Sequence, residues 1–129
     1  MDIDQARTFL AITAHGSFLE AARQLHLTQS TVSARIRRLE EELKTRLFIR
    51  NRAGASLTTA GRRFLDYAKR LVLTADQARD EVGLPERYRA SIRIGGRIVL
   101  WEGFLPQWVG WMRRCATDVV IRSEIGFEE

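Results

Sequence analysis

Two helix start signals, separated by a tight connection at residues 26–28, constrain the fold of this chain more than any other feature. The first is Ser17 with Glu20, an S-x-x-E capping box, and the second is Thr28 before a longer helix. Apolar residues of the longer helix follow at steps of four, three and four positions and share one stripe: Val32, Ile36, Leu39 and Leu43. Two helices joined by so short a turn predict a helix-turn-helix.

The flanking segments predict a winged version of this motif. Residues 2–15 are expected to form a helix that Asp2 caps. Strands at 47–50 and 56–58, with the polar loop 51–55 between them, are expected to pair as a β-hairpin. A hairpin directly after a helix-turn-helix is a wing. We therefore expect a mainly α fold, with a winged helix-turn-helix domain over residues 1–58.

Residues 59–83 are predicted to form one long linker helix, which begins after the N-cap Thr58. Its apolar residues repeat at steps of four and three, which is typical of a helix that pairs with another helix. The members of this seam are Phe64, Ala68, Leu71, Ala75, Ala78 and Val82. We predict that two copies of the chain dimerise through it, with packing against the chain's own first helix as the alternative.

Residues 84–129 change in pattern and predict a partial α/β segment. Ser91–Gly95 and residues 118–125 alternate like strands, and an apolar helical stripe runs from Trp101 to Cys115 between them. This order forms a βαβ unit with parallel strands. A two-stranded sheet cannot bury both faces. We therefore expect the truncated start of a larger α/β domain, with an orphaned core of three tryptophans and a buried Cys115.

The positive charge of the chain is concentrated in one segment. The net charge is +5, whereas residues 35–70 alone contain eleven basic and four acidic residues. The remainder is therefore slightly acidic. A concentrated basic segment is the expected footprint of phosphate binding, although a solvated charged face has the same composition.

The polar face of the helix after Thr28 carries amide, hydroxyl and guanidinium groups opposite the apolar stripe. These groups match the donors and acceptors in the major groove of B-form DNA. The predicted base-reading residues are Gln29, Ser30, Ser33 and Arg37. The predicted contacts to the DNA backbone or minor groove are Thr28, Thr31, Arg38, Arg50 and Arg52. Glu40, Glu41 and Glu42 are expected to lie beyond the contact zone because phosphate repels them.

Several functional classes are not expected. His15 and His26 lack the spaced ligands of a metal site, and no nucleophile–base set or phosphate-binding glycine loop occurs, so we predict neither an enzyme nor a cofactor. Cys115 is the single cysteine and cannot form an internal disulfide. No apolar run is long enough for a membrane span, and the N-terminus lacks the pattern of a signal peptide. The cytoplasm is the expected compartment.

Residues 1–83 resemble the DNA-binding domain of LysR-type transcriptional regulators. The resemblance lies in FLAITAHGSFLEAARQLHLTQSTVSARIRRLEEEL and RLFIRNRAGASLTTAGRRFLDYA. It implies that Gln29, Ser30, Ser33 and Arg37 read bases, and that Thr28, Thr31, Arg50 and Arg52 hold the DNA backbone. Residues 91–125 resemble the start of the family's periplasmic-binding-protein-like effector domain, which implies a small-molecule inducer and a tetramer in full-length members.

This chain departs from the family pattern at several positions. Ser30 replaces a common proline, Ala34 replaces a longer polar residue, and Lys44-Thr45 replaces a glycine at the helix end. The predicted function is a dimeric, sequence-specific regulator that binds a palindromic operator with its recognition helix in the major groove. The alternative is a truncated partner that forms heterodimers with a full-length relative and antagonises it.

Overall fold

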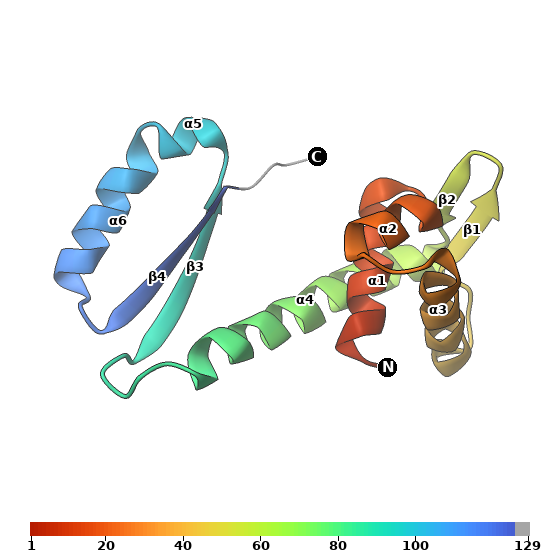
Figure 1. The fold of residues 1–129 in the computed structure, drawn as a ribbon, viewed down its shortest axis with the longest axis horizontal. Helices are drawn as coiled ribbons and strands as arrows, with labels where there is room; N and C mark the ends of the chain where they lie inside the picture. Colours follow the sequence, from red (N-terminus) through yellow and green to blue (C-terminus); the bar gives the residue numbers. More distant parts are fainter. Residues whose placement is uncertain (126–129) are drawn as a thin grey trace. The chain divides into compact units, whose positions relative to one another are not determined.

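The computed structural model describes residues 1–125 and contains two units, of which the first is Met1–Ala75 and the second begins at Asp76. The first unit follows the order of a winged helix-turn-helix (Figure 1). Its elements are α1 (Ile3–His15), α2 (Phe18–Leu25), α3 (Gln29–Leu43), β1 (Phe48–Asn51), β2 (Gly54–Leu57) and the first part of α4 (Thr59–Val82). This order confirms the predicted fold class.

Three side-chain caps set where the first three helices begin. The Asp2 carboxylate accepts the N–H of Gln5 at 2.8 Å, and the Gln5 side chain accepts the N–H of Asp2 at 2.9 Å, which completes a capping box. Ser17 accepts the N–H of Glu20 at 3.3 Å, and Thr28 caps α3 in the same way. These predicted starts are confirmed, and they fix the turn between α2 and α3.

The predicted bounds of the wing were wrong. β1 and β2 pair antiparallel up to Asn51 and Gly54, so the turn has two residues instead of the five expected. The reason is a contact with the end of α1. Gly54 has a φ of +129°, and an added Cβ would lie 2.3 Å from the carbonyl oxygen of Gly16. The N–H of Ala55 donates to that same oxygen at 2.8 Å, which anchors the hairpin.

The core of the first unit joins α1 to every other element. The Phe9 ring lies 5.1 Å from the Phe48 ring of β1 and 4.9 Å from the Phe64 ring of α4, between ring centroids. The predicted stripe of α3 faces this core, with Val32, Ile36 and Leu39 buried. Packing the stripe inward leaves the opposite face of α3 to solvent.

The seam of α4 divides into two halves. Phe64 and Ala68 are buried in the core of the first unit, and Leu71 packs partly buried against that core. The alternative interpretation, packing against the chain's own first helix, describes Phe64, whose ring contacts Phe9 of α1. Phe64 and Ala68 are therefore not free for a partner helix. Further along, Ala78 and Val82 are exposed. A dimer role for the second half stays a prediction.

The second unit contains the predicted βαβ unit. Its elements are β3 (Ala90–Gly96), α5 (Ile98–Trp101), α6 (Phe104–Cys115) and β4 (Val119–Ile125). The two strands pair in parallel from Ala90↔Val119 to Gly96↔Ile125. The helix begins later than expected, after the short α5, and Pro106 falls in the first turn of α6, where its missing N–H costs nothing.

Few side chains are buried in this second unit. Leu105 is the one buried residue among the described residues from 76 to 125, and Trp111 is half exposed. Cys115 is exposed, which corrects the expectation of a buried cysteine. The reason is that a two-stranded sheet with one helix covers little apolar surface.

A carboxylate from α4 holds two neighbouring arginines of the sheet. Arg93 and Arg122 are directly opposite each other in the β3–β4 register. Asp80 lies 2.5 Å from the Arg93 guanidinium and 3.4 Å from that of Arg122, and Glu124 also pairs with Arg93 at 3.1 Å. The Asp80 hydrogen bond is the main cause that raises the pKa of Arg93. These pairs balance two like charges that would otherwise repel.

Residues 1–125 contain no helix that is long and apolar enough to cross a membrane. The same described residues contain no group of three or more His, Cys, Asp or Glu side chains that could hold a metal ion.

Candidate nucleic-acid interface

The N-terminal half of α3 presents the polar groups that the sequence places opposite the core stripe. Gln29, Ser30 and Arg37 are exposed, and Ser33 is half-buried. The side chains therefore share an outward face as predicted, and their contact with bases stays a prediction.

Hydroxyl groups cluster where α3 begins. The Thr28 hydroxyl lies 3.0 Å from the Ser30 hydroxyl and 2.7 Å from the Thr31 hydroxyl, while it also accepts the N–H of Thr31 at 3.2 Å. A helix N-terminus offers unpaired N–H groups and a partial positive charge. This end of α3 has the chemistry of a phosphate contact.

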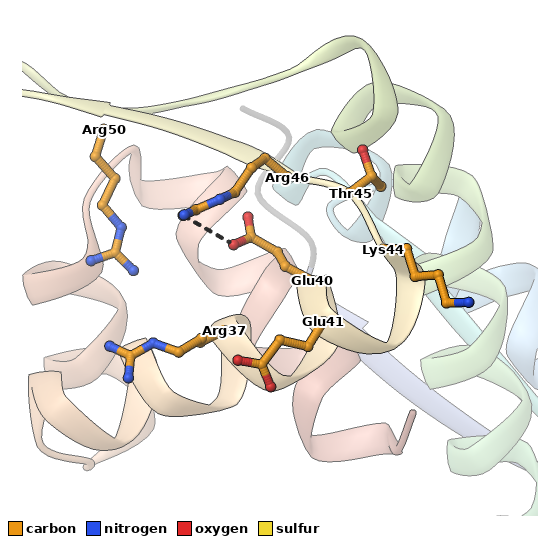
Figure 2. A pocket seen from close by; sticks show the side chains of 7 residues that line it. All are labelled: Arg37, Glu40, Glu41, Lys44, Thr45, Arg46 and Arg50. Atoms are coloured by element: carbon orange, nitrogen blue, oxygen red, sulfur yellow. Dashed lines mark ion pairs between the residues drawn. The ribbon is translucent and has the colours of Figure 1, made fainter.

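A basic groove of about 610 Å³ lies between α3 and β1. Figure 2 shows its lining side chains: Arg37, Glu40, Glu41, Lys44, Thr45, Arg46 and Arg50. Four of these are cationic and two are acidic. Lys44 and Arg46 belong to the basic segment of the sequence, but their spacing does not predict that they lie beside the recognition helix. No sequence signal links them to it, because the groove forms only when β1 folds back along α3.

Glu40 has a structural role that sequence analysis missed. Its carboxylate accepts the N–H of Leu47 at 2.7 Å and that of Phe48 at 3.3 Å, and it pairs with Arg46 at 3.7 Å. Its side chain is only 11% exposed. Glu40 therefore joins α3 to the start of the wing, whereas sequence analysis grouped it with Glu41 and Glu42.

We expect Glu40→Ala to destabilise the chain by about 1.5–3 kcal/mol, because it leaves backbone donors of the wing without their charged acceptor. Chemical denaturation followed by circular dichroism measures this loss. Glu41→Ala is the matched control, since Glu41 is an exposed neighbour on the same helix, and it should change stability by less than about 0.5 kcal/mol. Equal effects of both substitutions would contradict the role assigned to Glu40.

Arg38 and Arg52 have different surroundings. Arg38 pairs with Glu42 at 3.5 Å on the surface of α3. A hydrogen bond from the N-terminal ammonium of Met1 is the main cause that lowers the pKa of Glu42, so this carboxylate stays ionised. Arg52 is exposed in the two-residue turn of the wing. Both guanidinium groups are accessible to a ligand.

Arg50 points away from the turn of the wing. Its guanidinium carbon lies 3.5 Å from the centroid of the Phe18 ring, and its Nη1 donates to the Ser33 hydroxyl at 3.4 Å. Partial burial is the main cause that lowers the pKa of Arg50, and the charges of Arg37 and Arg46 lower it further, against an opposing effect of Glu40. An arginine remains charged under these conditions.

Comparison with known proteins identifies the motif. A family model described as bacterial regulatory helix-turn-helix protein, lysR family, matches residues 3–62. The HTH-type transcriptional regulator HdfR of Escherichia coli O139:H28 is 44% identical over 110 residues, which are 85% of this chain and 39% of that protein. HdfR of Shigella boydii serotype 18 matches to the same extent. The chain thus spans about two fifths of the length of these relatives.

Solved structures show the same architecture. The CbnR DNA-binding domain, in a crystal structure of its complex with DNA, is 32% identical with a TM-score of 0.60, and the match covers 62% of this chain and 92% of that one. The BenM DNA-binding domain, in complex with catB site 1 DNA, is 34% identical with a TM-score of 0.59, and the match covers 62% and 90%. The chain therefore belongs to the LysR family of bacterial regulatory helix-turn-helix proteins, a family of DNA-binding transcriptional regulators.

Proposed function

We propose that this chain is a sequence-specific transcriptional regulator, or the DNA-binding part of one, that binds a palindromic operator as a dimer. The observation that carries the proposal is the polar face of α3 beside a groove lined by arginines. It occurs on a scaffold whose relatives, at 32% and 34% identity, were crystallised with DNA. A major groove is wide enough to admit one helix, and α3 is the helix whose outward face is polar.

The residues divide into two proposed roles. The base-reading residues are Gln29, Ser30, Ser33 and Arg37, since an amide suits adenine and a guanidinium suits guanine. The backbone contacts are Thr28 and Thr31 at the start of α3, with Arg38, Arg46 and Arg52. We add Arg46 to this group because its side chain lines the basic groove. Arg50 is a different case, because Phe18 and Ser33 already engage its guanidinium.

The proposed dimer uses the second half of the α4 seam, from Ala75 to Val82. Val82 is 87% exposed and Ala78 is also exposed, so these seam side chains are available to a second copy. A two-fold dimer reads half-sites about one helical turn, ~10 bp, or a multiple of it apart.

The proposed organisation has three parts. Residues 1–58 form the DNA-binding domain, residues 59–83 the linker and dimerisation helix, and residues 84–129 belong to an effector domain, of which residues 126–129 lie outside the described part of the chain. An effector domain of the periplasmic-binding-protein type holds a small-molecule inducer, so a ligand of that class is proposed for the whole protein and not for this segment. Contact with chromosomal DNA places the proposed function in the cytoplasm.

The test is binding to a duplex selected from a random-sequence library with the unmodified chain. We expect Gln29→Ala and Arg37→Ala each to weaken binding by about 10- to 100-fold, because each removes a contact to a base edge. Fluorescence anisotropy on the selected duplex measures the dissociation constant. Gln107→Ala and Arg113→Ala are matched controls on exposed positions of α6 and should leave it unchanged. A chain that enriches no duplex contradicts the proposed function.

A further inference from the structure

The side chain of Arg50 joins three elements of the first unit. It starts on β1, its guanidinium carbon lies 3.5 Å from the centroid of the Phe18 ring of α2, and its Nη1 reaches the Ser33 hydroxyl of α3 at 3.4 Å. Phe18 is itself fixed, because it is 5% exposed and packs edge-on against Phe48, with ring centroids 5.6 Å apart. The Arg50 guanidinium therefore rests on a ring that is itself held in place by the core.

Arg50 lines two hollows on this surface. The first is the basic groove that Arg37 also lines (Figure 2). The second is a smaller cleft of about 160 Å³, lined by Phe18, Gln29, Asn51 and neighbouring residues of the wing and α2. Arg50 is therefore shared by the hollows of two proposed base-reading residues, Arg37 and Gln29.

The hydrogen bond to Ser33 has a consequence for the chemistry of α3. A serine hydroxyl has one hydrogen and two lone pairs. The Arg50 Nη1 donates to the oxygen, so it occupies a lone pair and leaves the hydrogen free. One lone pair stays open, but the bond donated by Arg50 polarises the O–H group, which makes the hydroxyl a better donor. A donor suits the acceptors in the major groove, which are purine N7, guanine O6 and thymine O4, and does not suit the amino group of cytosine.

We propose that Arg50 is a positioning residue: it clamps β1 of the wing to α2 and holds the Ser33 hydroxyl as a hydrogen-bond donor toward an acceptor on a base edge. This inference rests on the proposed function for its effect on DNA, whereas the clamp itself is a property of the free chain. The role requires the planar fork of arginine, because a lysine ammonium neither stacks on the ring as a plane nor directs a fixed N–H toward Ser33.

The DNA test compares Arg50→Lys, Arg50→Gln and Ser33→Ala, with the double variant, on the selected duplex. We expect Arg50→Lys to weaken binding about tenfold, nearly as much as Arg50→Gln, and Ser33→Ala to have far less effect once Arg50 is changed. For Arg50→Gln, the slope of log K against log salt should change by less than the ~0.9 that a lost phosphate contact produces. Arg52→Gln, the matched control on the wing, should change it by that amount.

Two DNA results overturn the inference. One is wild-type affinity for Arg50→Lys, which would make charge alone sufficient. The other is additive loss in the double variant with a full change of slope for Arg50→Gln, which would make Arg50 a simple phosphate contact.

A second measurement needs no DNA and keeps this inference separate from the proposed function. We expect Arg50→Lys to increase amide hydrogen exchange of the wing, residues 49–57, by about tenfold over wild type, because the clamp closes the hairpin onto α2. Arg52→Lys is the control and should leave the exchange unchanged. Unchanged exchange in Arg50→Lys overturns the clamp, whether or not the chain binds DNA. A wild-type chain that binds no duplex, with exchange raised in Arg50→Lys, contradicts only the proposed function and the role toward the base.

Discussion

The affinity of this chain for double-stranded DNA is expected to fall about 10³- to 10⁵-fold between 50 and 200 mM salt, which corresponds to roughly 6–10 phosphate contacts. The reason is the number of accessible cations on the proposed interface. The proposed backbone contacts Arg38, Arg46 and Arg52 are all exposed on α3 or around the wing, so a dimer presents six such groups. Each neutralised phosphate releases condensed counterions, and added salt reverses that release.

The measurement is a salt titration of fluorescence anisotropy, with the mass of the complex from light scattering on the same sample. A dimer should show the steep dependence, whereas a monomer with half the contacts should lose only about 10²-fold over the same range. Arg113→Gln is the control for net charge, because it removes one exposed cation from α6 and should leave the slope unchanged. Binding that ignores salt would remove the electrostatic basis of the proposed interface.

Much of the first unit could be predicted because its signals are local. The caps at Asp2, Ser17 and Thr28 act on N–H groups three positions away, so their effect can be recognised in a short stretch of sequence. The stripe of α3 likewise depends only on helical spacing, and it determines which face is left for a ligand. For this reason the polar face of α3 was predicted residue by residue.

The errors arose where distant parts of the chain meet. The wing is tighter than expected because Ala55 bonds the carbonyl of Gly16, a partner on another element. Glu40 reads as one of three acidic residues at a helix end, and only the folded chain brings the N–H groups of Leu47 and Phe48 to it. The stack of Arg50 on Phe18 has the same origin. Spacing rules describe neighbours along one element and do not describe such contacts.

The α4 seam shows a different limit of sequence analysis. A regular apolar repeat indicates that a helix face is covered, but it does not say by what. Here the core of the same chain covers Phe64 and Ala68, while Val82 remains exposed. One continuous apolar repeat in α4 therefore runs from the core into solvent. The spacing of the repeat does not change where the surroundings do.

Phe9→Ala is expected to destabilise the first unit by about 3–5 kcal/mol, the cost of removing a large buried ring and leaving a cavity. The Phe9 side chain is fully buried, and its ring contacts Phe48 in the wing and Phe64 in α4. Loss of the ring therefore weakens the packing of α1 against β1 of the wing and against the linker helix α4. Since small domains have about 5–15 kcal/mol of stability in total, this one change removes a large part of it.

Urea denaturation with two optical signals locates the effect. All three tryptophans lie within residues 101–111 of the second unit, so their fluorescence follows that unit, whereas circular dichroism at 222 nm also follows the helices of the first. We expect Phe9→Ala to shift the dichroism transition to lower urea and to leave the tryptophan emission spectrum in the absence of urea unchanged. Phe104→Ala is the matched control, because Phe104 is 62% exposed and little packing is lost. Equal shifts of the dichroism midpoint for both variants would contradict a core centred on Phe9. Other contacts would then have to hold β1 of the wing in place beside α3.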